Sequence, residues 1–328
     1  HTNVKNGDIV PCTNLLENPS TLLEDPRMEE LLDKLAEDYR YVIVDAPPLV
    51  NVADGVQMAH MCDGFPLYYD GFNEKGLCIA GLNFTESAVF GSVREGSVNV
   101  AQYELIPQIL GRCADINEVR KLAKNLNITG ERFKADMPAA RLHWMIADKS
   151  GAVVLEQTVD GLHLYDDPAG VLTNEPTFPA QLAGLNDYMS LSPYPPKNRF
   201  SDALPLCAYS RGMGALGLPG DMSSKSRFVR AAFLRANSVC GSGRLPGIMQ
   251  FFHLLGSVEQ QRGAVRMPDG QCEITIYSSC MDPKEGAYLF KTYDDISVRS
   301  VNLYGADVAG TQPTAYPVED RMQIRRLN

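Results

Sequence analysis

The sequence has no long apolar run and no cluster of basic residues. No stretch approaches the roughly 18 consecutive apolar residues that a membrane-spanning helix needs. Lys and Arg total 30 against 40 Asp and Glu, which gives a net charge of −10 and argues against nucleic acid and anionic membrane surfaces as partners. Residue 1 is His1, and a polar stretch follows it rather than a basic and then an apolar one, so we expect no signal peptide and a cytoplasmic location.

Several motifs of common enzyme classes are also absent. None of the eight cysteines forms a Cys-x-x-Cys pair, and the five histidines are isolated, so we expect reduced and mostly buried thiols, no metal site and no cofactor. The sequence contains no Gly-x-Ser-x-Gly elbow, which disfavours a serine hydrolase of that fold. Residues 212–217 match Gly-x-Gly-x-x-Gly, but Pro219 follows where a helix should open, so this motif predicts a tight loop.

What is present is enough for a large folded body. The chain has 328 residues, of which 45% are hydrophobic, and it can form one large domain or two modest ones. The first sixty residues have a pattern of their own: a short strand at 8–10, a helix capped by Asp25 with Pro26 at its first position, and an apolar strand at 41–44. That order predicts a parallel α/β unit.

The remainder has the pattern of an antiparallel protein. Strands are predicted at 141–148, 152–158 and 162–165, joined by Gly-containing turns into a meander. A further pair is predicted where residues 272–279 alternate in period two and can pair with 287–293 across a turn. Helices are predicted after a capping box at 115–118, and at 225–237 and 246–261. Antiparallel strands with segregated helices indicate an α+β layered domain.

The front segment resembles part of a nucleotide-binding protein. A hydrophobic strand that ends in Asp45 is typical of domains that hold Mg²⁺ with that carboxylate, although a core strand with a polar end has the same pattern. Stretches at 18–19, 27–32, 42–48 and 53–55 make residues 1–61 similar to the C-terminal half of a bacterial tyrosine kinase of the capsule-regulating type. The phosphate loop that such an enzyme needs is absent, since no Gly-Lys pair occurs, and we expect no ATP chemistry.

The rest of the chain carries a second and more extensive resemblance. The motifs that carry it, in order, lie at 66–71, 73–77, 80–84, 142–144, 170–174, 217–221, 226–228 and 277–280. With these motifs residues 62–328 resemble the choloylglycine hydrolase family. The resemblance implies a four-layer αββα N-terminal-nucleophile hydrolase fold, here with its first strands replaced by the short α/β segment. It also implies cleavage of a linear amide, in a glycine or taurine conjugate of a bile acid or in penicillin V, and a homo-oligomer, usually a tetramer.

Site residues follow from the same resemblance. Asn83 and Asn174 match the family's catalytic asparagines, and Arg227 matches its late arginine. Without the resemblance, each Asn would be interpreted as a turn residue and Arg227 as a residue on a helix surface. Phe133 and Met137 match apolar positions of the steroid pocket, and ordinary core packing explains them equally well. Asn83 favours bile salts over penicillin as the substrate, since the family's penicillin acylases tend to carry Tyr there.

The resemblance fails where the family carries its nucleophile. That nucleophile is a cysteine whose free α-amine, with a pKa of about 8, accepts the thiol proton, and nothing before Pro66 matches that segment. Cys62 follows Met61 and so imitates the family's Met-Cys start, but the family has a pocket residue there. Its nitrogen is free only if the chain is cut after Met61. We therefore expect a weak or inactive hydrolase, and a non-catalytic bile-acid-binding protein, a chimera and a penicillin V acylase remain alternatives.

Overall fold

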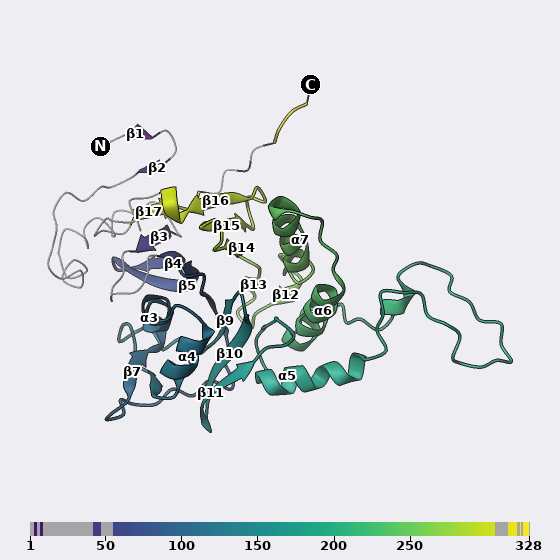
Figure 1. Ribbon diagram of the computed structural model, residues 1–328, viewed down its shortest axis with the longest axis horizontal. Coiled ribbons are helices and arrows are strands. Elements are labelled where there is room, and N and C mark those ends of the chain that lie inside the picture. The colour runs from purple at the N-terminus through teal and green to yellow at the C-terminus, as the bar shows by residue number, and fades with distance from the viewer. Residues whose placement is uncertain are drawn as a thin grey trace. The chain divides into compact units, whose positions relative to one another are not determined.

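The computed structural model describes residues 3–4, 7–8, 42–46, 55–305, 314–319, 322 and 324–327 (Figure 1). Contacts divide the chain into two compact units. The first unit combines His1–Pro168 with Ile276–Asn328, and the second unit is Ala169–Thr275. Within the described residues, no helix is both long enough and apolar enough to cross a membrane.

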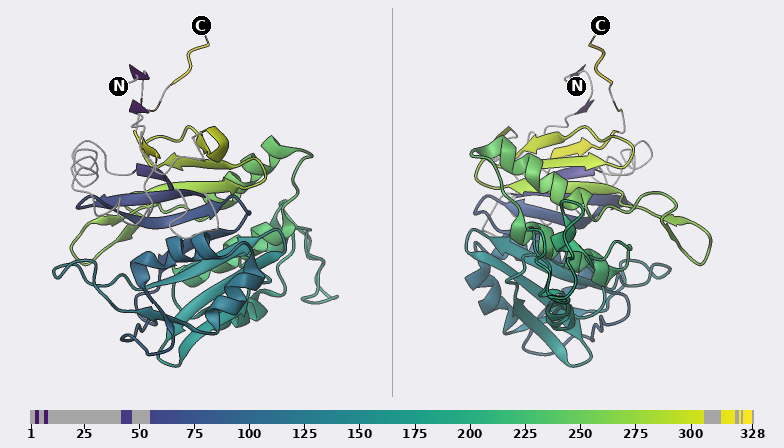
Figure 2. Two further views of the ribbon diagram at one scale, coloured as in Figure 1. Left: turned by 60° about the vertical axis from the view of Figure 1, so that its left-hand side comes forward. Right: turned by 90° about the vertical axis from the view of Figure 1, so that its right-hand side faces the viewer.

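The first unit is built on an eight-stranded sheet in which every neighbouring pair is antiparallel (Figures 1 and 2). The strands, in their order across the sheet, are β11 (Gly161–Asp166), β10 (Gly151–Thr158), β9 (Leu142–Asp148), β6 (Cys78–Asn83), β5 (Phe65–Asn73), β4 (Gly55–Cys62), β3 (Val42–Ala46) and β17 (Thr314–Pro317). The predicted meander is confirmed as β9, β10 and β11.

Further elements of the first unit pack on this sheet. A three-stranded antiparallel sheet contains β14 (Tyr277–Asp282), β15 (Ala287–Thr292) and β16 (Arg299–Asn302). The helical elements are η1 (Gln102–Glu104), α3 (Leu105–Arg112), α4 (Ile116–Ala123) and η4 (Leu303–Gly305). Two further strands, β7 (Val98–Ala101) and β8 (Leu126–Thr129), form a parallel pair. Two short strands, β1 (Asn3–Val4) and β2 (Gly7–Asp8), pair with each other. The predicted pairing of 272–279 with 287–293 is confirmed as β14 with β15, the first strand with later limits.

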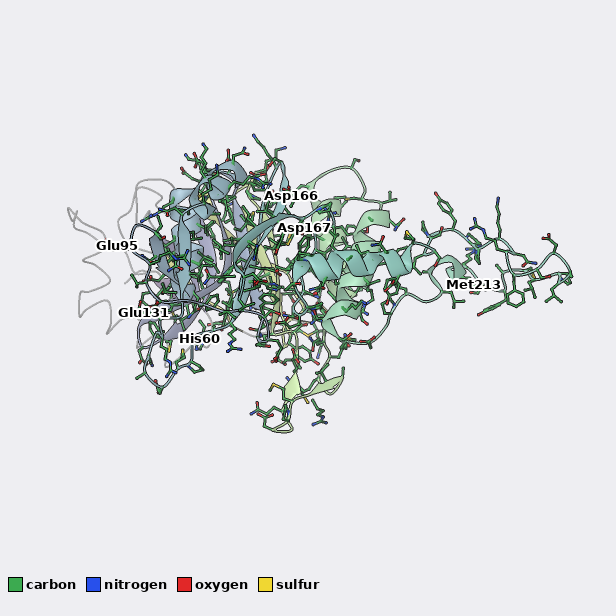
Figure 3. All side chains as sticks on the ribbon, turned by 90° about the horizontal axis from the view of Figure 1, so that it is seen from below. His60, Glu95, Glu131, Asp166, Asp167 and Met213 are labelled. Carbon is green, nitrogen blue, oxygen red and sulfur yellow. The ribbon has the colours of Figure 1, made fainter. Side chains whose placement is uncertain are left out.

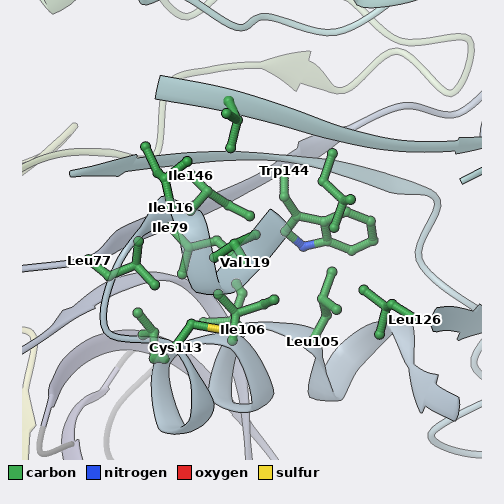
Figure 4. Close-up of a cluster of buried hydrophobic side chains, with 14 of the residues drawn as sticks. Leu77, Ile79, Leu105, Ile106, Cys113, Ile116, Val119, Leu126, Trp144 and Ile146 are labelled. Carbon is green, nitrogen blue, oxygen red and sulfur yellow. The ribbon is translucent and has the colours of Figure 1, made fainter. Parts of the chain in front are cut away.

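Each face of the large sheet closes its own hydrophobic core. On one face, Trp144 of β9 belongs to a buried cluster with residues of α3 and α4, such as Leu105 and Val119 (Figure 4). On the other face, Phe72 of β5 belongs to a cluster with Tyr288 of β15. Successive strand residues point to opposite faces, so the first unit has a helical layer, the large sheet and the small sheet in that order.

A β-bulge in β5 decides which of its side chains face the small sheet. Asp70 pairs with Met58 and Tyr68 pairs with Ala59, so Tyr69 is an additional residue in β5. Tyr68 accordingly packs against the cluster beneath α3, whereas Asp70 reaches side chains of the small sheet. The bulge therefore places a carboxylate between the two sheets.

The prediction of a parallel unit at the front is wrong for its strand at 42–46. β3 forms there, but it pairs antiparallel with β4 and with β17. A strand–helix–strand order does not fix which strands pair. The next strand after β3 in the chain is β4, and two consecutive strands can pair antiparallel without a crossover helix between them. The predicted front helix and Cys12 lie outside the described residues.

Most of the regular secondary structure of the second unit is helical. It contains α5 (Phe178–Gly184), η2 (Leu185–Tyr188), η3 (Met213–Ala215), α6 (Ser224–Asn237), α7 (Arg244–Gly256) and the pair β12 (Val265–Arg266) and β13 (Cys272–Glu273). The helices predicted at 225–237 and 246–261 are confirmed as α6 and α7, the latter with earlier limits. The predicted tight loop is also found, since Gly212 and Gly217 have φ values of 83° and 97° on either side of the short η3.

Polar side chains define the start of α6. Ser223 is the N-cap residue and its Oγ accepts the N–H of Ser226. The Asp221 carboxylate accepts the N–H of Ser223 at 2.9 Å and the Oγ–H of Ser226 at 2.5 Å. The bonds from Ser223 and then from Ser226 hold the pKa of Asp221 well below its usual range. Arg230 donates to the Asp221 carbonyl at 3.1 Å, so the first turn of α6 is fixed from several directions.

The Asp70 carboxylate joins the two sheets of the first unit. It is buried, and it accepts hydrogen bonds from Tyr277 at 2.9 Å, from Ser279 at 2.8 Å and from Tyr288. Burial raises the pKa of Asp70, and the hydroxyl bonds oppose that rise without reversing it. Three hydroxyls of the small sheet, of which that of Tyr288 is buried, thus donate to one carboxylate.

We predict that Asp70→Leu destabilises the protein by about 1–3 kcal/mol, because the buried Tyr288 hydroxyl loses this acceptor while Tyr277 and Ser279 are only partly buried. Asp70→Asn keeps an acceptor and should cost less. The folded-state pKa lies above the unfolded value of about 3.9, so this group's contribution is complete below that pH and is lost as the pH rises through the folded pKa. Urea unfolding at several pH values should show this dependence weakened in Asp70→Asn and unchanged in the exposed-turn control Asp160→Asn.

We predict the opposite pH dependence for Asp221, whose folded-state pKa is lowered. Its contribution is present above the unfolded pKa of about 3.9 and is lost as the pH falls toward the folded pKa. Asp221→Asn should therefore lower the melting temperature near neutral pH, and the difference should begin to narrow below about pH 4. Asp202→Asn, at an exposed carboxylate of the same unit, is the control. A difference that stays constant from pH 7 to pH 3 would contradict this role.

Candidate active site

The second unit brings two of the predicted site residues into contact. Arg227, in the first turn of α6, donates from Nη2 to Oδ1 of Asn174 at 2.5 Å, across 53 residues of sequence. A guanidinium has donors only, so it holds the amide oxygen of Asn174 as the acceptor. This contact fixes the orientation of the Asn174 amide, with its oxygen toward Arg227 and its NH₂ group turned away from it. The N–H donors of such an amide can stabilise an oxyanion.

The charge of Arg227 is partly withdrawn from solvent. Burial lowers the pKa of Arg227, the nearby Glu273 raises it, and the like charge of Arg230 lowers it. A guanidinium stays protonated under these influences because its ordinary pKa exceeds 12. Nε of Arg227 donates to the carbonyl of Met222 at 3.0 Å, which fixes the plane of the group. Arg227 therefore presents a positive charge in a fixed orientation to Asn174.

Residues that sequence reasoning missed hold the main chain of Asn174. Its N–H donates to Oγ of Ser224 at 2.9 Å, and its carbonyl accepts from Nε2 of Gln181 at 2.6 Å. Ser224 is close in sequence to the Ser-Arg-Phe motif, which could have drawn attention to it, whereas nothing in the sequence around Gln181 distinguishes it from a surface glutamine of a short helix.

The third predicted polar residue, Asn83, lies in the first unit. It is the last residue of β6, is exposed, and pairs with Leu142 of β9. The next residue, Phe84, is fully buried and stacks on the ring of His143 with the centroids 4.3 Å apart. The His143 ring in turn lies 3.0 Å from the Glu156 carboxylate. The strand that presents Asn83 is therefore anchored in the core directly after it.

The predicted apolar pocket residues also lie in the first unit. The ring of Phe133 lies 5.2 Å from that of Phe65 and 5.5 Å from that of Tyr103, measured between centroids. Phe133 and Met137 are half-buried, so neither is a fully enclosed core residue. Partly open aromatic rings of this kind suit a flat apolar ligand.

Cys62 lies close to these rings. It ends β4, opposite Phe65, and is half-buried. Lys134, next to Phe133 in sequence, forms an ion pair with Asp63, and that bond together with the neighbouring Cys62 raises the pKa of Lys134. Cys62 is thus a thiol beside a cation, in a strand whose main chain continues on both sides. The other described thiols range from buried Cys113 and Cys280 to exposed Cys207 and Cys240.

Comparison with known proteins gives the same family over most of the chain. The model of the choloylglycine hydrolase family of linear amide C–N hydrolases matches residues 38–316, a range that includes β3 and β4. A bile salt hydrolase/transferase of Lactiplantibacillus plantarum is 47% identical over 266 residues, which cover 81% of this chain and 82% of the relative. A crystal structure of a variant conjugated bile acid hydrolase from Clostridium perfringens has a TM-score of 0.81 and 31% identity, over 88% of this chain and 92% of that one.

A much shorter match links the chain to a kinase. The tyrosine-protein kinase CpsD of Streptococcus agalactiae is 33% identical over 66 residues, which cover 20% of this chain and 28% of that protein. This share is too small to assign a domain. The extensive matches instead confirm the predicted fold class, and the chain belongs to the choloylglycine hydrolase family of linear amide C–N hydrolases.

Proposed function

We propose that the chain carries the substrate-binding and amide-activating parts of a conjugated bile acid hydrolase, the type that releases glycine or taurine from bile salts. The observation that carries the proposal is the bond from Arg227 to Asn174, which orients an amide donor beside a fixed positive charge. The relatives named as bile salt and conjugated bile acid hydrolases support the same substrate class.

The reaction assigns a role to each of these groups. A thiolate attacks the carbonyl carbon of the substrate amide, and the carbonyl oxygen becomes negatively charged. The Asn174 amide donates to that oxyanion, and the charge of Arg227 favours the same state. Asn83, at the end of β6 in the first unit, is the other asparagine that the family resemblance implies for the reaction. In this scheme the amide nitrogen leaves with the glycine or taurine, and water then releases the bile acid from the thioester.

The attacking thiolate requires a base, and in this family that base is the cysteine's own free α-amine. Every cysteine of the printed sequence has residues on both sides, so its nitrogen is part of a peptide bond. Cys62 is a weak candidate for the nucleophile because its nitrogen is also part of a peptide bond, although it lies beside Lys134. We therefore propose that a protein of the printed sequence binds conjugated bile acids and hydrolyses them weakly or not at all, as a non-catalytic binding protein would.

The bile acid is proposed to lie against the half-open rings around Phe133, and the family resemblance adds the half-buried Met137 to this site. A steroid has a broad apolar face, and burying one aromatic side chain against it contributes about 1.5–3 kcal/mol. Asn83 favours a bile acid over penicillin V, which is the alternative substrate. The site requires no metal or other cofactor in this scheme.

We predict that purified protein of the printed sequence binds glycocholate in calorimetry but releases glycine no faster than buffer does. Phe133→Ala should weaken binding about tenfold, the equivalent of about 1.4 kcal/mol. Phe251→Ala, at an exposed ring of α7, should leave the affinity unchanged. Asn174→Ala should change the affinity little, because its donor acts on the oxyanion rather than on the bound substrate.

Turnover of glycocholate, taurocholate or penicillin V would contradict the inactivity if it disappears in Cys62→Ser and persists in the exposed-thiol control Cys240→Ser. Absence of any bile-salt binding would instead remove the proposed substrate class. The two results are independent, since one concerns the nucleophile and the other the apolar site.

We further propose a homo-oligomer, with a tetramer as the family resemblance implies. The loop between η2 and η3 extends away from the helices of the second unit, and Met213 marks its return (Figures 1 and 3). Large apolar side chains of this loop are each at least 75% exposed: Met189, Tyr194, Phe200 and Tyr209. So much exposed apolar surface is characteristic of an interface between chains.

We predict that the double substitution Phe200→Asp and Tyr209→Asp lowers the assembly mass in sedimentation velocity, because each charge would have to be buried in the interface. Val159→Asp is the control, since Val159 is an equally exposed apolar residue of the β10–β11 turn. A wild-type protein that sediments as a monomer at all concentrations would exclude the oligomer.

A further inference from the structure

A buried glutamine, Gln181, holds the segment that carries Asn174. Gln181 lies on α5 and is 1% exposed. Its Nε2 donates to the carbonyl of Asn174 at 2.6 Å and to the carbonyl of Pro176 at 3.1 Å. Its Oε1 accepts the Oγ–H of Thr173 at 2.9 Å. Both donor hydrogens and the acceptor of the Gln181 amide are therefore used, and they bind Thr173, Asn174 and Pro176.

A second helix holds the same segment from its other side. Oγ of Ser224, at the start of α6, accepts the N–H of Asn174 at 2.9 Å, and it lies 2.9 Å from Oγ of Thr173. The two polar groups of the Asn174 main chain are thus bound by side chains of two different helices. A main chain bound at both its N–H and its carbonyl cannot turn about its axis without breaking one of these bonds.

The two helices are themselves fixed to each other. Phe178 of α5 packs edge-on against Phe228 of α6, with the centroids 6.3 Å apart, and both rings are almost fully buried. Phe228 directly follows Arg227 in α6. The aromatic contact therefore sets the distance between the helix that holds the Asn174 carbonyl and the helix that provides the Arg227 guanidinium.

We propose that Gln181 is a positioning residue for the reaction: it acts through the main chain of Asn174 and keeps the side-chain amide of Asn174 in the geometry that Arg227 requires. This inference rests on the proposed role of Asn174. Its physical basis is the narrow tolerance of oriented catalytic groups, where a displacement of about 1 Å can reduce a rate about a hundredfold. Gln181 does not touch the substrate in this scheme.

The chemistry of the position is specific to glutamine. Two carbonyl oxygens face Nε2, so the group there must donate, whereas Oε1 faces a hydroxyl and must accept. Ionised glutamate at this position would place a carboxylate oxygen, which only accepts, against the two carbonyl oxygens of Asn174 and Pro176. Methionine has a similar length but makes neither bond. Protonated glutamate regains one donor, so the effect of Gln181→Glu should diminish at low pH.

The first unit provides a matched control. Gln157 is also buried, and its Nε2 donates to the carbonyls of Ile128 at 2.8 Å and Val89 at 3.2 Å, while its Oε1 accepts the N–H of Ile128 at 3.0 Å. Gln157→Met therefore removes two donated bonds and one accepted bond from a buried amide in the other unit, as Gln181→Met does in the second unit. Its general effect on stability should be comparable to that of Gln181→Met.

The experiment uses the full chain with ¹⁵N-labelled asparagine, and Asn174 is assigned by its loss in Asn174→Ala. Gln181→Met should shift the side-chain NH₂ signals of Asn174 toward their positions in Arg227→Met, and should speed exchange of the Asn174 main-chain amide at least tenfold. Gln157→Met should leave the Asn174 signals in place. Gln181→Glu should resemble Gln181→Met at neutral pH and return toward wild type in acid.

Unchanged Asn174 signals in both Gln181 variants would overturn the proposal, and so would an equal shift in Gln157→Met. If Gln181→Met does not fold, the pH response of Gln181→Glu decides the matter by itself. Failure of the wild-type protein to bind glycocholate would count against the proposed function but would leave this dependence of Asn174 on Gln181 measurable, so the two failures are distinguishable.

Discussion

The contact between the Arg227 guanidinium and the Asn174 amide oxygen is the constraint on which the rest of the site depends. An asparagine amide has a donor end and an acceptor end of nearly equal size, and only its neighbours decide which end faces a ligand. A guanidinium resolves that choice because it can only donate. The capped start of α6 then serves to keep Arg227 in place, and the bonds from Gln181 and Ser224 serve to keep Asn174 in place.

How much of the fold the sequence predicts depends on how local the determining pattern is. The meander β9–β11 and the hairpin β14–β15 were predicted correctly, since a few adjacent residues encode alternation and turns. The pairing of β3 was not predicted correctly, because its pairing with β4 and β17 depends on the packing of the complete sheet and not on adjacent residues. The bulge at Tyr69 is equally invisible in the sequence, yet it sends Asp70 to the face opposite Tyr68.

The same distinction holds for the site. Asn174 and Arg227 could be named from motifs at 170–174 and 226–228, and the structure joins them. Gln181 could not, because a hydrogen bond to a main-chain carbonyl depends on geometry and leaves no pattern in a sequence. Phe133 was equally compatible with a core and with a pocket, and only its half-exposed position beside Phe65 and Tyr103 favours the pocket.

The polar networks also bear on whether a chain of this family can fold without its nucleophile. Asp70 binds hydroxyls of the neighbouring sheet, and Asn174 is bound by α5 and α6, so neither needs a cysteine to satisfy it. The cluster under α3 and α4 is likewise formed by residues between Leu77 and Leu155. The described bonds of Asp70 and Asn174 thus do not involve a cysteine. In the proposed binding protein, the loss of an attacking thiol would remove a reactant and leave the described supports of Asn174 and Arg227 intact.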